Sequence, residues 1–200
     1  MAKLSPKEVT LYLLVLVPVC FLATAALQQL RAVEESLLPF LYYHFKAKDI
    51  PFIMAAVTFM WTYVITASLS VIAQSSGVKN GYHNNEPRVH RSSVKGAMAR
   101  MVAAHQVALE NAPAFFAAVI IASAKQVPLK YRNSFSVIYT FLRIIHTPLY
   151  VLDFDIARVI THIMALSCTV WLFAFALFPG FEEHYSSITE VVAILRSVSD

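Results

Sequence analysis

Long apolar stretches without charged side chains dominate the chain. Residues 9–30 and 51–73 contain no charge at all, and a membrane-spanning helix needs roughly 20 predominantly apolar residues. Strands of a membrane barrel are instead about 10 residues long and alternate in polarity. Because an α-helix satisfies its own backbone hydrogen bonds in lipid, the pattern predicts an all-α integral membrane protein.

Three further apolar segments follow, and each contains a few ionisable side chains. They cover residues 96–124, 134–152 and 156–178. Short polar connections join them, and Pro179-Gly180 is expected to end the last helix because proline cannot continue one. We therefore expect a small bundle of four or five spanning helices.

The apolar pattern divides the chain into three parts. Residues 1–50 form an N-terminal extension with a hydrophobic helix at about 9–30, which spans the bilayer or lies against the edge of the bundle, and an amphipathic segment at 31–48. Residues 51–180 hold the four other helices. Residues 181–200 form a tail that we expect at the membrane interface.

Composition supports a membrane protein and excludes other classes. The 200 residues are 58% hydrophobic and 14% charged, whereas soluble domains average about 25% charged. The formal net charge of +4 fits the basic flanks of a membrane protein rather than a surface for nucleic acid. The largest basic cluster lies in a polar loop at 75–95, which the positive-inside rule places on the cytoplasmic side or its organellar equivalent. Cys20 and Cys168 lie in apolar runs and provide no disulfide framework.

Ionisable and polar residues within the later helices are the candidate site. An ionisable side chain at the centre of a span costs about 2.5–3.5 kcal/mol on insertion scales, so it usually faces the bundle interior and has a partner. On three helices such residues recur at helical spacing and share a face. They are Gln106 with Glu110, Arg143 with His146 and Tyr150, and Arg158 with His162. No side chains at metal-ligand spacing accompany them, so no metal site is expected.

Two interpretations of this set remain open. The residues could tie the helices together through buried salt bridges, for example between Glu110 and Arg143. They could also line a pocket for an anionic ligand, because the planar fork of arginine binds both oxygens of a carboxylate. A transporter or channel is less favoured, since the polar residues are too few and the bundle too small to line a path.

The same residues carry a resemblance to a known family. The run from Arg100 to Phe115, RMVAAHQVALENAPAF, resembles the signature of the MAPEG family, the membrane-associated proteins of eicosanoid and glutathione metabolism. Downstream, the pattern R-x-x-H-x-x-x-Y over 143–150, and then Arg158, is similar to the third helix of the family and the start of its fourth. The resemblance covers about residues 51–178.

This resemblance implies a fold and an assembly. Members of the family are four-helix bundles that form trimers, so this chain would be a MAPEG-like bundle with one additional N-terminal hydrophobic helix. Many members bind glutathione between neighbouring subunits and use it for conjugation, peroxide reduction or isomerisation. Others bind lipid or protein partners without catalysis.

The matching positions imply roles for individual residues. Glu110 would hold the glutathione amine, beside Gln106 at the position of a basic glutathione contact. Arg158 matches the arginine thought to stabilise the glutathione thiolate, and it is the candidate catalytic residue, because a nearby guanidinium lowers the pKa of a thiol. The other expected contacts to glutathione are Arg143, His146, Tyr150 and His162.

Two functions are therefore expected as alternatives. The first is a glutathione-dependent transferase or peroxidase that acts on lipophilic electrophiles from the bilayer, with glutathione as co-substrate. The second is a non-catalytic scaffold subunit whose extra helix docks it onto a larger membrane assembly, and Gln106 and Val107 favour it because they depart from the signature. Its expected partners are the lipid bilayer and a homotrimer or other membrane subunits, in the endoplasmic reticulum or mitochondria.

Overall fold

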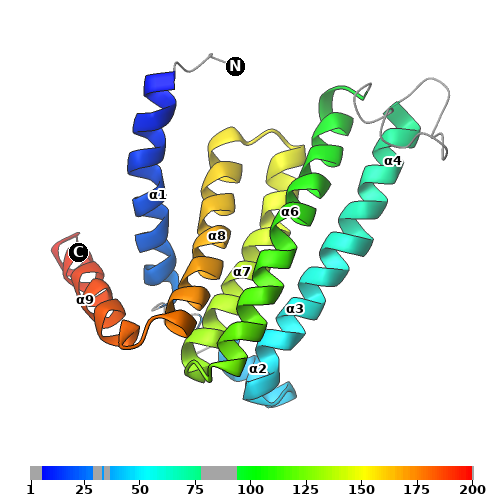
Figure 1. The fold of residues 1–200 in the computed structure, drawn as a ribbon. Helices are drawn as coiled ribbons and strands as arrows, with labels where there is room; N and C mark the ends of the chain where they lie inside the picture. The colour runs from blue at the N-terminus through cyan, green and yellow to red at the C-terminus, as the bar shows by residue number, and fades with distance from the viewer. Residues whose placement is uncertain (1–5, 29–32, 34–36, 78–93, 200) are drawn as a thin grey trace.

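The computed structural model describes residues 6–28, 33, 37–77 and 94–199, and within these ranges every regular element is helical (Figure 1). The elements are α1 (Pro6–Gln28), α2 (Leu38–His44), the short 3₁₀ helix η2 (Ala47–Asp49), α3 (Ile50–Met60), the π-helical η3 (Trp61–Thr66), α4 (Ala67–Gly77), α6 (Gly96–Ala124), α7 (Leu129–Val151), α8 (Asp155–Leu177) and α9 (Phe181–Ser199). The prediction of an all-α protein is confirmed.

Three stretches of the described chain are long and apolar enough to cross a membrane. They are the continuous rod from η2 to α4 (Ala47–Gly77), α6 and α8. α1 has 23 residues and carries no charge from residue 9 to its end, and α7 is less apolar than α8 although it has the same 23 residues. α7 begins at Leu129, directly after Pro128 and five residues before the predicted start.

The position of α7 explains its polarity. It packs against α3, α6 and α8, and in Figure 1 it stands between α8 and α3 behind α6. Its polar side chains are buried between helices, as shown by Asn133, Ser136 and Thr140. Such residues face protein rather than lipid, so they do not prevent the helix from lying within a membrane bundle.

Small hydroxyl side chains line the contact between the α3–η3–α4 rod and its neighbours. The hydroxyl oxygens of Thr58 and Thr140 lie 3.0 Å apart, and Thr66 Oγ1 lies 3.0 Å from His105 Nδ1. Small polar residues allow close packing of membrane helices and form hydrogen bonds across the contact. His105, from the middle of the signature run, therefore contributes to helix packing.

The first and the last helix of the chain meet at the foot of α8. α1 packs along α8, and α9 leaves the end of α8 and contacts α1 (Figure 1). The phenol of Tyr185, in α9, is fully buried and donates a hydrogen bond of 3.2 Å to Gln28 Oε1 at the end of α1. Burial raises the pKa of Tyr185 well above its usual value, which keeps this donor protonated. Helix α8 ends before Pro179 and Gly180 (φ +74°), as the sequence predicts.

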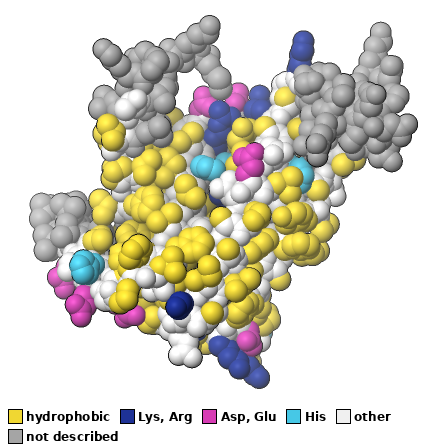
Figure 2. Space-filling view, viewed as in Figure 1, with side chains coloured by type: hydrophobic (Ala, Val, Ile, Leu, Met, Phe, Trp, Pro, Cys, Tyr) yellow, Lys and Arg dark blue, Asp and Glu magenta, His cyan; other side chains and the backbone are white. Residues whose placement is uncertain are grey.

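The surface has the pattern of a bilayer-embedded protein. Figure 2 shows apolar side chains covering most of the middle of the helices, with most of the charged side chains toward their two ends. Large apolar residues on the rod are exposed, among them Phe59, Met60 and Ile72. A soluble monomer rarely exposes so continuous an apolar surface, so the protein is an integral membrane protein.

Candidate functional site

A cavity of about 230 Å³ lies between α6, α7 and α8. Its lining residues are Val107, His146, Tyr150, Arg158, Val159 and His162. Four of these six are candidates identified in the sequence, and the two valines give the cavity an apolar side. The structure thus brings residues from separate motifs to one place.

Helical spacing and a tight turn explain this convergence. His146 and Tyr150 are one turn apart on α7, and Arg158 and His162 are one turn apart on α8, so each pair shares a face. The short α7–α8 turn folds the two faces together. The ring centroids of His146 and His162 lie 5.8 Å apart, and those of His146 and Tyr150 lie 5.5 Å apart.

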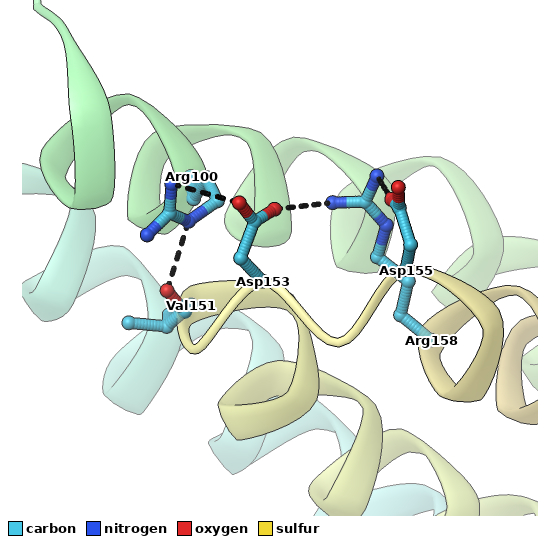
Figure 3. A network of polar contacts seen from close by, with 5 residues as sticks. All are labelled: Arg100, Val151, Asp153, Asp155 and Arg158. Atoms are coloured by element: carbon cyan, nitrogen blue, oxygen red, sulfur yellow. Dashed lines mark hydrogen bonds and ion pairs between the residues drawn. The ribbon is translucent and has the colours of Figure 1, made fainter. Parts of the chain in front are cut away.

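Two carboxylates flank Arg158, one of the cavity-lining residues (Figure 3). Its guanidinium forms an ion pair with Asp155, one turn earlier, and a second at 3.6 Å with Asp153. The same guanidinium lies 4.8 Å from the centre of the Tyr150 ring, a distance at which a cation is attracted to the ring face. Arg158 is therefore held in position by groups of this chain.

Asp153, in the turn between α7 and α8, connects this turn to α6. Its carboxylate lies between two guanidiniums in Figure 3, with the Arg100 pair on α6 at 3.5 Å. Arg100 also donates from Nε to the carbonyl oxygen of Val151 at 2.9 Å. Asp153 has a φ of +67°, a left-handed conformation that Asp tolerates better than most residues. These ion pairs of Asp153 and Asp155 were not predicted from the sequence, although the three-residue spacing of Asp155 and Arg158 is a recognisable signal for a helical ion pair.

Arg143 contacts a cavity-lining residue but does not itself line the cavity, and it is only 5% exposed. Its Nη1 is 3.3 Å from Nδ1 of His162, and its guanidinium carbon is 5.3 Å from the centre of the Tyr139 ring. The Nε and Nη2 atoms are buried and have no hydrogen-bond partner among the described residues. The sequence grouped Arg143 with the cavity residues, and the structure places it in contact with His162 but not in the lining of the cavity.

Glu110 and Gln106 occupy the outer face of α6, where both are exposed. Gln106 Nε2 donates to Glu110 Oε1 at 3.0 Å. A salt bridge between Glu110 and Arg143, the example considered for the structural interpretation, is not found among the described side chains, because Glu110 is exposed whereas Arg143 is buried. Glu110 is nevertheless close enough to His162 to interact with it electrostatically.

No group of three or more His, Cys, Asp or Glu side chains in the described part of the chain could hold a metal ion. The polar groups that line the cavity are instead one guanidinium, one phenol and two imidazoles, all of which can donate hydrogen bonds. This set suits an organic ligand with anionic groups.

Comparison with known families gives one match. The model of the MAPEG family matches residues 51–178, a range that includes every candidate residue and the helices from α3 to α8. Neither curated proteins nor solved structures give a match. Because the matched range covers more than half of the 200 residues, the chain belongs to the MAPEG family.

Proposed function

We propose that this MAPEG protein binds glutathione in the cavity between α6, α7 and α8 and uses it on lipophilic electrophiles from the bilayer. The observation that supports this most is the convergence of His146, Tyr150, Arg158 and His162 on one cavity with an apolar side. The activity would be a transferase or a peroxidase. Both activities use the thiolate of glutathione as the nucleophile, and they differ in the atom of the substrate that it attacks.

The residues present fit the chemistry of glutathione. Arg158, Tyr150 and the two histidines offer donors to its carboxylates and thiol, and Glu110 offers an acceptor to its amine. Glutathione supplies a thiol whose thiolate form is the nucleophile. Arg158 would favour the thiolate through its charge, and Val107 and Val159 would limit the access of water.

The size of the cavity supports an oligomeric site. Pockets for drug-sized ligands measure roughly 300–1,000 Å³, so about 230 Å³ encloses only part of a tripeptide. Gln106 and Glu110 are exposed in the middle of α6, and an intramembrane carboxylate facing lipid is costly. A neighbouring copy, as in the homotrimer that the family implies, would cover this face and complete the site.

A scaffold role is the second candidate, and two contacts favour it. Glu110, the expected partner of the glutathione amine, already accepts a hydrogen bond from Gln106. Arg158, the expected partner of the thiolate, is already paired with Asp153 and Asp155. In this role, the exposed apolar side chains of α1, such as Leu14 and Val19, would contact other membrane subunits.

Calorimetry of glutathione binding to the detergent-purified protein separates the two. We expect saturable binding that falls by about tenfold or more in Arg158→Ala, because a charge-assisted hydrogen bond is lost. Arg132→Ala, in the first turn of α7 and so at the other end of the bundle, is the matched control and should bind as the wild type does. A folded protein that binds no glutathione at millimolar concentration leaves the scaffold role.

The membrane of the endoplasmic reticulum or the mitochondrion is the proposed location. Orientation depends on the basic loop at 75–95, of which residues 78–93 lie outside the described residues. Tagging either terminus and testing its accessibility in sealed organelles would establish both points.

A further inference from the structure

The segment formed by α2 and η2 exposes a group of aromatic rings at one end of the bundle (Figure 1). Five consecutive side chains, from Tyr42 to Lys46, are exposed, and Tyr43 reaches 86%. The rings of Phe40 and Tyr43 pack against His44, with centroids 4.9 and 5.0 Å from that of the imidazole. So many exposed rings in one short segment indicate a surface that contacts something other than water.

The segment is held firmly against the bundle by its other side. Leu38 is buried in one hydrophobic cluster with Val137 of α7. Asn133, also on α7, donates from Nδ2 to the phenol oxygen of Tyr42 at 3.2 Å and to the carbonyl oxygen of Ala47 at 3.0 Å. Because these contacts fix the backbone, the outward direction of the rings is a built feature of the fold.

The position of the segment places it at the edge of the bilayer. The apolar span Ala47–Gly77 begins at η2, and α6 ends at Ala124 at the same end of the bundle (Figure 1). The residues that directly precede such a span lie where the hydrocarbon meets the lipid headgroups. Tyrosine is enriched at this boundary because one end of its ring is apolar and the other polar.

Lysine side chains flank the rings at this level. Lys46 and Lys48 are exposed, as is Lys125 directly after α6, and no ion pair between described side chains involves any of them. Between residues 37 and 77, Asp49 is the only acidic residue. Each lysine near an anionic lipid surface strengthens binding by a factor of about five. The charge of the segment therefore complements a negative headgroup.

We propose that α2 and η2 bind the headgroup of an anionic phospholipid. The phosphate lies against Lys46 and Lys48, and the exposed rings lie beside the glycerol backbone and the first carbons of the acyl chains. This site goes beyond the proposed function, because the glutathione cavity lies near the α7–α8 turn, at the opposite end of the bundle. Helix α2 also precedes the range 51–178 that matches the family.

Native mass spectrometry of the detergent-purified protein tests the site, with phosphatidylglycerol and phosphatidylcholine of identical acyl chains as the probes. We expect the first phosphatidylglycerol to bind about tenfold more tightly than the first phosphatidylcholine. Lys48→Gln should weaken phosphatidylglycerol about fivefold, and the double variant with Lys46→Gln about tenfold or more, without an effect on phosphatidylcholine. Lys95→Gln, an exposed lysine at the opposite end of α6, is the matched control and should change neither affinity.

The rings are tested by Tyr43→Ser, which should weaken both lipids by a similar factor because the ring contacts the part that they share. A variant that binds both lipids as the wild type does overturns the role given to the rings. Equal affinities of the wild type for the two lipids overturn the site and leave an acidic protein segment as the partner of the lysines. A loss in Lys95→Gln as large as that in Lys48→Gln also overturns it.

Folding and glutathione binding serve as separate controls. The substituted side chains are exposed, so the variants should unfold at the wild-type temperature without lipid. The double lysine variant should bind glutathione as the wild type does. Loss of lipid preference with intact glutathione binding, or the reverse in Arg158→Ala, therefore tells the two proposals apart.

Discussion

The two arginines beside the cavity occupy contrasting surroundings. The Arg158 side chain is 18% exposed near the α7–α8 turn, and two carboxylates and an aromatic ring hold it. Arg143 is 5% exposed and has a histidine, an aromatic ring and two unpaired nitrogens. The charge nearer the surface is thus balanced by carboxylates, whereas no ion pair among the described side chains involves Arg143. Because a buried charge without a carboxylate partner is costly, the charge of Arg143 should be easier to remove without loss of stability than that of Arg158.

A carboxylate placed beside Arg143 would remove the contrast between the two arginines, and it should have the largest effect of the substitutions considered, on ligand affinity. His162→Glu puts an acid where the ring nitrogen now lies 3.3 Å from Nη1. The new internal ion pair should lower the affinity for glutathione by about 30-fold or more, measured by calorimetry. His162→Gln has nearly the shape of this glutamate without its charge, and it should lower the affinity less, by about tenfold or less, because only the hydrogen bond of the imidazole is lost. An equal loss in both variants would mean that the imidazole itself binds the ligand.

Removing the unbalanced charge should stabilise the protein without ligand. We expect Arg143→Met to raise the stability by about 1–2 kcal/mol, since apolar replacement of buried charges is often stabilising. The measurement is the thermal unfolding midpoint in detergent without ligand. The matched substitution Arg132→Met, in the first turn of α7, should change stability by less. A variant clearly less stable than wild type would show that Arg143 already has a compensating partner.

Removing the carboxylate of Asp153 near the α7–α8 turn should change the stability by a smaller amount. Asp153→Asn removes the partner of both Arg100 and Arg158 and should cost about 0.5–1 kcal/mol of stability, because the pairs are partly exposed. Asp153→Ala should cost about 1 kcal/mol more, since φ is +67° at this residue and Asn tolerates that conformation better. Thermal unfolding of the two variants separates charge from backbone. Equal midpoints would mean that the left-handed turn contributes nothing.

Asp155→Asn should have the smallest effect. The Asp155 side chain is 52% exposed and pairs with Arg158 within the first turn of α8, so we expect a loss of at most about 0.5 kcal/mol. High salt should reduce the difference further by screening. A loss above 1 kcal/mol that persists in 1 M salt, where the Debye length is about 3 Å, would contradict the view that this exposed ion pair contributes little to stability.

Local patterns in the sequence predicted much of the fold. The bounds of α6 agree with its apolar run, and the stops at Pro179 and Gly180 are found as expected. The start of α7 at Leu129 was not predicted, because hydropathy shows how well a segment suits lipid and not whether it is helical. The polar first turns of α7 are packed among other helices rather than lipid.

The candidate site was predictable where it depends on one helix at a time. Spacing correctly placed His146 with Tyr150 and Arg158 with His162, since helical periodicity fixes which residues share a face. Pairing between helices depends on rotation about each axis, which spacing does not encode. For this reason spacing could not decide whether Glu110 pairs with Arg143, and the ion pairs of Asp153 were not foreseen.

The buried bond between Tyr185 and Gln28 has a consequence for biogenesis. The two residues are 157 positions apart, so the first helix is synthesised long before the residue that fixes its end. During synthesis α1 must remain in the bilayer, or beside the insertion machinery, without its final contacts. Docking of the first helix is therefore among the last steps of assembly, and a polypeptide truncated before α9 would leave its N-terminal helix without this anchor.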